Sequence, residues 1–146
     1  MDEAVSLVRE LLGVGDDYAV LFLTGGASSQ FYMSALNLLN EDETAGYVNT
    51  GAWSTKAIKE AKHFGNVVEL ASSKDTNFSY IPKDYDIPAD LKYLHLTSNN
   101  TIFGTQFQAF PATNAPLVAD MSSDIFSRPL PVARFGVIYA GALANV

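Results

Sequence analysis

The chain has 146 residues, the length of a single domain that can bury a substantial core. Hydrophobic residues make up 48% and charged residues 17%, which excludes a largely disordered chain. The formal net charge of −7 would repel a phosphate backbone, so we expect no nucleic-acid partner. Because cysteine is absent and only two histidines occur, thiolate nucleophiles, disulfides and the usual zinc sites are excluded as well.

The apolar residues recur with alternating helical and strand-like patterns. No run of about eighteen apolar residues occurs and the N-terminus is acidic, so we expect neither a membrane span nor a signal peptide, and a cytoplasmic protein. Short continuous apolar runs next to glycine or polar residues are typical of strands buried on both faces. The predicted elements, in chain order, are a helix at 2–12, a strand at 19–23, a helix at 28–39, a strand at 46–49, a helix at 54–64, a strand at 67–70, a connection at 72–90, and strands at 93–96, 117–119 and 136–139.

This alternation predicts an α/β fold, a three-layer sandwich with a mainly parallel sheet of about six strands, in one domain over 1–146. In such a sheet a ligand lies beyond the carboxyl ends of the strands. The residues that follow the predicted strands are mostly small and polar. They are 25–29, 49–53, 98–101, Asp120 with Ser122 and Ser123, and 141–142.

Gly25 to Ser29 lie between a predicted strand and a predicted helix. Glycines let the backbone approach a ligand, and free N–H groups at a helix start attract a phosphate. Taken alone, the segment is better explained as a tight turn with Ser28 as the helix N-cap, because such a turn needs small residues anyway. Neither GxGxxG nor GK[ST] occurs in it, so the dinucleotide and nucleoside-triphosphate motifs are absent.

Trp53 and Asp120 are the two distinctive side chains after the predicted strands. Trp53 is the only tryptophan. It would stack on an aromatic ligand or, with equal weight, pack in the core. Asp120 ends a buried apolar run, where a carboxylate needs a cation or several donors. A protonated ring nitrogen of a ligand would satisfy it, and so would donors from Ser122 and Ser123. His95 alternates with leucines and is expected to be structural.

Five collinear blocks resemble the phosphoserine aminotransferase family, over nearly the whole chain. The blocks are 25–31, 47–54, 98–102, 119–125 and 135–142. The resemblance implies the large-domain core of a fold-type I enzyme that uses pyridoxal phosphate to transfer an amino group between glutamate and 3-phosphohydroxypyruvate, a step of serine biosynthesis. It also implies roles for single residues. Gly26, Ala27 and Ser28 would hold the cofactor phosphate, Trp53 would stack on the pyridine ring, Thr101 would hydrogen-bond the cofactor, and Asp120 would keep the ring nitrogen protonated.

The chain departs from this family where the chemistry is carried out. The family's last block continues with glutamine and the lysine that forms the Schiff base, but Leu143 and Ala144 stand there. A methyl group forms no imine, so we expect no catalytic residue and no transamination. The family also has an antiparallel strand between the strands matching 20–24 and 136–140, and this strand is missing here. Those two strands would pair directly, stay open or recruit another chain, and an open edge favours association.

These observations leave three readings open. We expect a trimmed and re-surfaced core of the large domain, with a natural degenerate paralogue as the less favoured origin. Such a core would be inactive but would retain weak, non-covalent binding of pyridoxal phosphate. The second reading is a folding unit without a ligand, and the third is a phosphate-binding module that uses residues 25–29. The family's phosphate site is completed by a second subunit, so the partners we expect are a small phosphate ligand and a homodimer or edge-strand association.

Overall fold

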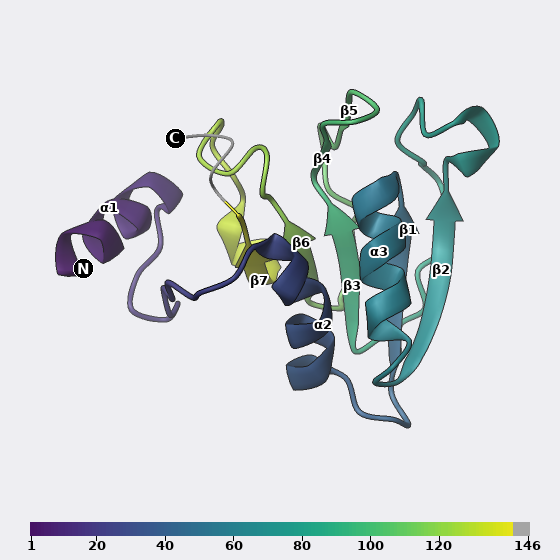
Figure 1. Cartoon of the computed structure of the whole chain (residues 1–146), viewed down its shortest axis with the longest axis horizontal. Coiled ribbons are helices and arrows are strands. Elements are labelled where there is room, and N and C mark those ends of the chain that lie inside the picture. The colour runs from purple at the N-terminus through teal and green to yellow at the C-terminus, as the bar shows by residue number, and fades with distance from the viewer. Residues whose placement is uncertain (142–146) are drawn as a thin grey trace.

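A computed structural model describes residues 1–141. The described chain forms a five-stranded, entirely parallel sheet with three α-helices, as Figure 1 shows. This arrangement confirms the predicted α/β class. The strands, in their order across the sheet, are β2 (Asn66–Ser72), β1 (Thr44–Asn49), β3 (Tyr93–Thr97), β6 (Leu117–Asp120) and β7 (Phe135–Tyr139). The helices are α1 (Asp2–Leu12), α2 (Ala27–Leu38) and α3 (Ala52–Ala61), and a small antiparallel pair is formed by β4 (Asn99–Asn100) and β5 (Thr105–Gln106).

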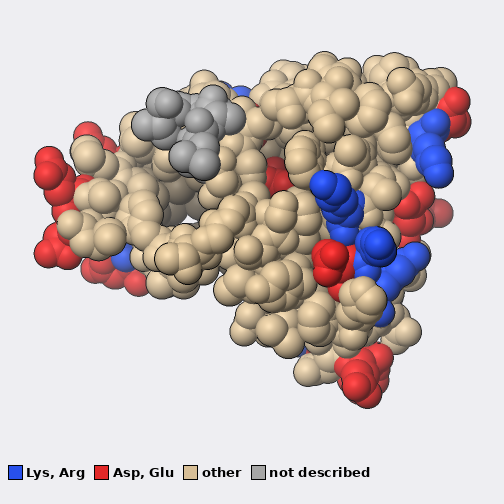
Figure 2. All heavy atoms as spheres, viewed as in Figure 1, with Lys and Arg blue, Asp and Glu red and all other residues tan. Residues whose placement is uncertain are grey.

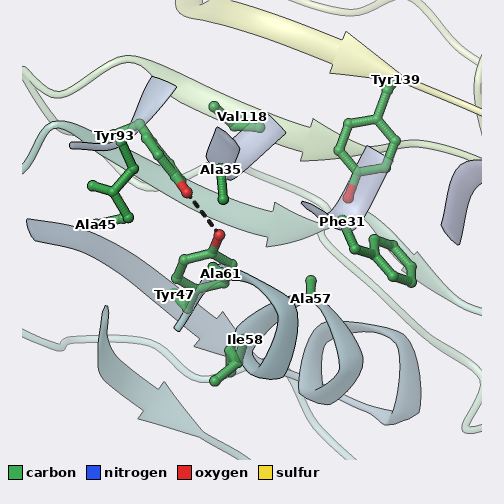
Figure 3. Close-up of a cluster of buried hydrophobic side chains, with 11 residues drawn as sticks. Phe31, Ala35, Ala45, Tyr47, Ala57, Ile58, Ala61, Tyr93, Val118 and Tyr139 are labelled. Atoms are coloured by element: carbon green, nitrogen blue, oxygen red, sulfur yellow. Dashed lines mark hydrogen bonds between the residues drawn. The ribbon is translucent and has the colours of Figure 1, made fainter. Parts of the chain in front are cut away.

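Helices α2 and α3 cover one face of the sheet. Phe31 and Ala35 of α2, and Ala57 and Ala61 of α3, are buried against the strands. Small alanine side chains let both helices lie close to the sheet, and Figure 3 shows Ala35, Ala57 and Ala61 in one cluster with Tyr47 and Tyr93 of the strands. The lysines of α3, Lys56 and Lys59, are exposed, and Figure 2 shows basic side chains gathered over this helix.

Among the described residues, no α-helix packs on the second face of the sheet. Phe107, Met121 and Phe135 are buried against this face of the sheet. Irregular segments within 81–87 and 107–130 supply further apolar side chains, including Ile81 and Leu130. The third layer of the predicted sandwich is therefore made of loops, which bury apolar area as helices would.

A polar aromatic cluster lies inside the helix-covered face. The hydroxyls of Tyr47 and Tyr93 are 2.8 Å apart, as Figure 3 shows. The His95 Nε2 atom lies 2.8 Å from the Tyr139 hydroxyl, and the His95 ring stacks on Tyr47 with centroids 4.8 Å apart. Burial lowers the pKa of His95 to about 3, so the imidazole is neutral. This environment confirms that His95 is a structural histidine.

The strand predicted at 19–23 is wrong: the segment has no regular secondary structure and pairs with no strand of the described chain. Leu21, Phe22 and Leu23 are 71%, 53% and 54% exposed. A β-strand needs a neighbour for its backbone groups, and β7 forms a ladder only with β6 among the described residues. Within the described residues the sheet thus has five strands instead of about six, and the expected direct pairing of segment 20–24 with β7 does not occur.

The segment is nevertheless fixed to β7 at both of its ends. The Tyr18 hydroxyl lies 3.0 Å from the Val132 carbonyl oxygen and 3.1 Å from that of Phe135, at the start of β7. At the other end, Ala27 contacts Gly141, just beyond β7. We call residues 1–25 the N-terminal arm. Its helix α1 buries no residue, and Figure 1 shows it apart from the sheet.

Candidate functional site

The loops that follow the parallel strands lie at one edge of the sheet. Strands β1, β3, β6 and β7 run in the same direction, so their carboxyl ends share this edge. The starts of α2 and α3 reach the same edge. Gly141, just after β7, lies close to Ala27 of α2, and Gly51, just before α3, lies close to Asn100 in the loop after β3. The predicted site residues are therefore brought to one side of the molecule, as the topology rule requires.

Asp120 ends β6 and is only 4% exposed. Its Oδ1 atom accepts two hydrogen bonds from Ser122, one from the backbone N–H at 3.0 Å and one from the hydroxyl at 2.6 Å. Burial raises the pKa of Asp120, while the hydrogen bonds from Ser122 oppose that rise. The Oδ2 atom accepts no hydrogen bond from the described residues, so the two oxygens of this buried carboxylate have different surroundings in that part of the chain.

The donors expected for Asp120 are partly confirmed. Ser122 supplies both, whereas the Ser123 hydroxyl donates to the Asn99 carbonyl oxygen at 3.0 Å and accepts from the Asn99 side-chain amide at 2.9 Å. Ser123 therefore joins the loop after β3 to the loop after β6. Adjacent serines serve different neighbours because successive residues of the loop point in different directions.

The start of α2 carries the predicted phosphate-binding residues. Gly26 is the N-cap residue, with φ −87° and ψ 177°, and Ala27 and Ser28 form the first turn. The alternative with Ser28 as N-cap is wrong, because the helix begins one residue earlier than predicted and no side chain caps it. Gly26 and Ser28 are exposed and Ala27 is half-buried, so the first turn of the helix lies at the surface of the described chain.

Gly141 brings the start of α2 against the end of the sheet. A Cβ atom on Gly141 would lie 3.2 Å from the backbone N of Ala27 and 3.3 Å from its Cβ, so glycine permits this close approach. The Gly141 N–H donates to the Ser122 hydroxyl oxygen at 3.0 Å. Ala27, Gly141, Ser122 and Asp120 therefore form a continuous chain of contacts.

Trp53 lies in the first turn of α3. Its side chain is half-buried and packs against the helix-side core, and Lys56 Nζ lies 4.5 Å from the centroid of its ring. A cation over the indole face is stabilised by the ring quadrupole. Trp53 thus packs partly in the core, and part of its surface remains accessible. Stacking on a ligand and packing in the core both stay predictions for this residue.

Thr101 is exposed in the turn between β4 and β5. The neighbouring Asn100 is buried and its amide donates to the Thr50 hydroxyl oxygen at 3.1 Å. A Cβ atom on Gly51 would lie 2.8 Å from Asn100 Oδ1, so glycine lets the start of α3 approach this turn. Thr101 and Trp53 are therefore placed by two loops that contact each other.

Sequence reasoning missed Asp124 as a supporting residue of this edge. Asp124 is 4% exposed and accepts hydrogen bonds from the Ser98 hydroxyl and from the Gln106 amide, the latter at 3.1 Å. Its Oδ2 atom lies 3.9 Å from Arg128. The Ser98 hydroxyl also lies 3.0 Å from the Asp120 carbonyl oxygen. The sequence feature that could have indicated this role is the presence of a second acidic residue four positions after Asp120.

Some predictions concern other parts of the chain. Ala144, which stands at the predicted Schiff-base position, and Leu143 lie outside the described residues. Within residues 1–141 no group of three His, Cys, Asp or Glu side chains is placed to hold a metal ion. In the same part of the chain no helix has the length and hydropathy needed to cross a bilayer.

Comparison with known proteins identifies the same family over almost the whole chain. The family model described as aminotransferase class-V matches residues 1–143. Two curated relatives are the phosphoserine aminotransferases of Flavobacterium johnsoniae, 60% identical over 147 residues, and Bacteroides fragilis, 55% identical over 146 residues. Each alignment covers 100% of this chain and 41% of the relative. The chain therefore spans about two fifths of the length of the curated relatives it matches.

Solved structures agree with this assignment. Phosphoserine aminotransferase from Bacillus circulans subsp. alkalophilus superposes with a TM-score of 0.93 at 49% identity, over 99% of this chain and 41% of that one. The PLP-bound phosphoserine aminotransferase from Trichomonas vaginalis gives 0.85 at 34% identity, over 95% and 40%. The chain belongs to the class-V aminotransferase family, and its similarity within that family is to the phosphoserine aminotransferases.

Proposed function

We propose that this chain is the cofactor-binding part of the large domain of a phosphoserine aminotransferase and that it binds pyridoxal phosphate without a covalent bond. The observation that carries the proposal is the buried Asp120 carboxylate, whose Oδ1 is occupied by Ser122 and whose Oδ2 has no hydrogen-bond partner among the described residues. In the complete relatives we expect amino transfer between glutamate and 3-phosphohydroxypyruvate.

The ring end of the ligand suits Asp120. A buried carboxylate with one uncommitted oxygen favours a protonated ring nitrogen, because the cation offsets the cost of burying the charge. When bound, pyridoxal phosphate supplies an electron-withdrawing ring that accepts the electrons released at a substrate carbon. Asp120 would hold the proton on the ring nitrogen, Trp53 would cover one face of the ring, and Thr101 would donate a hydrogen bond at its rim.

The phosphate end suits the start of α2. Gly26, Ala27 and Ser28 present accessible backbone N–H groups there, and no side chain of the described residues caps the helix. A helix N-terminus favours an anion through these donors and through the helix dipole. Because Ala27 is linked to Asp120 through Gly141 and Ser122, the two ends of the ligand would be held at a fixed separation.

We propose that the chain does not catalyse transamination. Ala144 stands where the family resemblance places the lysine that bonds to the cofactor, and alanine supplies neither a nucleophile nor a base. Leu143, beside it, replaces a polar residue by an apolar one, which accords with a repacked site. A trimmed origin for the chain stays a prediction, and an intact mass of the native source protein equal to that of this chain would contradict it.

The alternative is a folding unit without a ligand. It is favoured by the position of Trp53, which packs on the core and already has Lys56 against its ring. Under this alternative the Lys56 ammonium replaces the ligand as the neighbour of the indole, and Trp53 serves stability alone.

A titration with pyridoxal phosphate distinguishes these functions. Trp53 is the only tryptophan, so its fluorescence reports on this edge of the sheet. We expect saturable quenching together with a change in the ring absorbance, and no reduced adduct at a single lysine after borohydride treatment and peptide mapping. Asp120→Asn is the control variant for recognition of the pyridine ring. A titration with inorganic phosphate alone tests the third reading, a phosphate-binding module that uses residues 25–29. Absence of quenching at millimolar ligand would leave the folding unit.

A further inference from the structure

The hydroxyl of Ser122 lies between the two ends of the proposed cofactor site. It donates to Asp120 Oδ1 at 2.6 Å and accepts the Gly141 N–H at 3.0 Å, while the Ser122 backbone N–H reaches the same Oδ1 at 3.0 Å. A serine hydroxyl has one proton to donate and lone pairs to accept, so these contacts are compatible with one another. Its proton points toward Asp120 and its lone pair toward Gly141.

The two donors of Ser122 determine which carboxylate oxygen is available. Oδ1 accepts two hydrogen bonds, which fill its principal acceptor directions, whereas Oδ2 has no such bond among the described residues. A proton shared with a ligand would therefore lie at Oδ2. Without the hydroxyl, the carboxylate would be free to rotate, and burial would act on the ionised form with only the backbone donor to oppose it.

The acceptor side of the same hydroxyl connects Asp120 to the start of α2. Gly141 approaches Ala27 so closely that a Cβ atom on Gly141 would lie 3.2 Å from the Ala27 backbone N. Gly141 and the first turn of α2 therefore lie close together, so the position of Gly141 bears on that of Ala27. Ser122 is the one described side chain that bonds to both Asp120 and Gly141.

We propose that Ser122 is a positioning residue, which orients Asp120 so that Oδ2 faces the ligand and which couples Asp120 to the anion-binding start of α2 through Gly141. This inference rests on the proposed function for its consequence in cofactor binding. The hydrogen-bond coupling itself belongs to the ligand-free protein and is measured there.

Three variants separate this role from a structural one. Ser122→Ala removes the hydroxyl, Ser122→Thr restores it, and Ser123→Ala removes the neighbouring hydroxyl, which bonds to Asn99 and not to Asp120. Thermal unfolding followed by circular dichroism establishes that each variant is folded. If Ser122→Ala fails to fold, the comparison of Ser122→Thr with Ser122→Cys provides the same contrast between a strong and a weak donor.

The first readout is the carboxyl carbon resonance of Asp120 in the ligand-free protein as a function of pH. Ser122→Ala is expected to raise the Asp120 pKa above that of the wild type, because a hydrogen bond to the ionised form is lost. Ser122→Thr and Ser123→Ala are expected to keep the wild-type titration. An unchanged titration in Ser122→Ala would overturn the inference even if the wild type binds pyridoxal phosphate.

The second readout is the dissociation constant of pyridoxal phosphate, compared with that of inorganic phosphate, at several pH values. Ser122→Ala is expected to weaken pyridoxal phosphate about tenfold, the range for one charge-assisted hydrogen bond. Phosphate affinity should fall in the same variant if the Gly141 link is real, and an unchanged phosphate affinity would overturn that half of the inference. If the wild type binds no pyridoxal phosphate, the proposed function fails, while the titration of Asp120 still decides the coupling.

Discussion

The N-terminal arm and strand β3 contain similar apolar residues but meet opposite environments. Every residue of β3 is buried, with β1 on one side and β6 on the other. In the arm, α1 buries nothing and Leu21 is 71% exposed. An apolar run of this kind becomes a strand only where neighbours pair with its backbone, so its structure depends on the neighbouring strand and not on the run itself.

A core truncation should therefore affect the two regions very differently. Leu94 is fully buried at the centre of the sheet, so Leu94→Ala is expected to lower the free energy of unfolding by about 2–5 kcal/mol. Leu21→Ala in the arm, the matched control, should change it by less than about 0.5 kcal/mol. Urea unfolding measures both. Equal losses would mean that the arm packs in solution.

Acidification should destabilise the centre of the sheet through His95. Burial lowers the His95 pKa to about 3 in the folded chain, against 6.5 for a free imidazole. The unfolded chain therefore binds more protons between these values, and stability falls as the pH drops below about 6.5, by up to about 1.4 kcal/mol per pH unit. His95→Gln should remove this component in denaturant titrations at pH 7 and pH 5. His63, exposed after α3, supplies the control His63→Gln.

Replacing Asp120 should stabilise the folded chain and at the same time weaken ligand binding. Burial raises the Asp120 pKa, so ionisation of this carboxyl costs stability at neutral pH, and Asp120→Asn should raise the free energy of unfolding at pH 7. The gain should vanish near pH 3, where Asp120 is protonated in both states. The same variant should weaken pyridoxal phosphate binding.

Asp124→Asn is the matched control for that substitution. Asp124 accepts from Ser98 and Gln106 and lies beside Arg128, so its charge is compensated and its loss should destabilise the fold. If both variants shift the unfolding midpoint in the same direction, the distinction between an open and a compensated carboxylate is wrong.

The smallest effect on stability is expected at the exposed end of the arm. Phe22→Ser should change the unfolding free energy by less than about 0.5 kcal/mol, because the side chain is 53% exposed. It should lower self-association, since the exposed apolar segment 21–23 and the open edge of β7 favour contact between copies. Sedimentation velocity over a range of concentrations measures this, with Tyr32→Ser, on the exposed face of α2, as the control.

The five strands of the sheet could be predicted from the sequence, whereas the unpaired state of segment 19–23 could not. Runs such as 93–96 and 117–119 became strands because both flanking strands lie within this chain. The segment 19–23 has the same pattern, and only the ladder partner that it lacks distinguishes it. The family resemblance indicated this gap, but periodicity alone could not.

The residues that gather at the site could be predicted from the sequence, but their hydrogen-bond partners could not. The topology rule brought Asp120, Trp53, Thr101 and the start of α2 to one edge of the sheet. It could not assign partners, because the directions of adjacent side chains in a loop depend on backbone angles that no short motif determines. Hence Ser122 and Ser123 looked equivalent in the sequence but bond to different residues.

Tyr139 ends the outermost strand and takes part in both the interior and the site. Its hydroxyl meets His95 inside the core, and its carbonyl oxygen accepts the Met121 N–H at 2.9 Å, just after Asp120. When an edge strand opens, every contact that it carries is lost in the same event. The apparent affinity of the site is therefore the intrinsic affinity multiplied by the fraction of ligand-free molecules in which β7 is closed, and amide hydrogen exchange along this strand would measure that fraction.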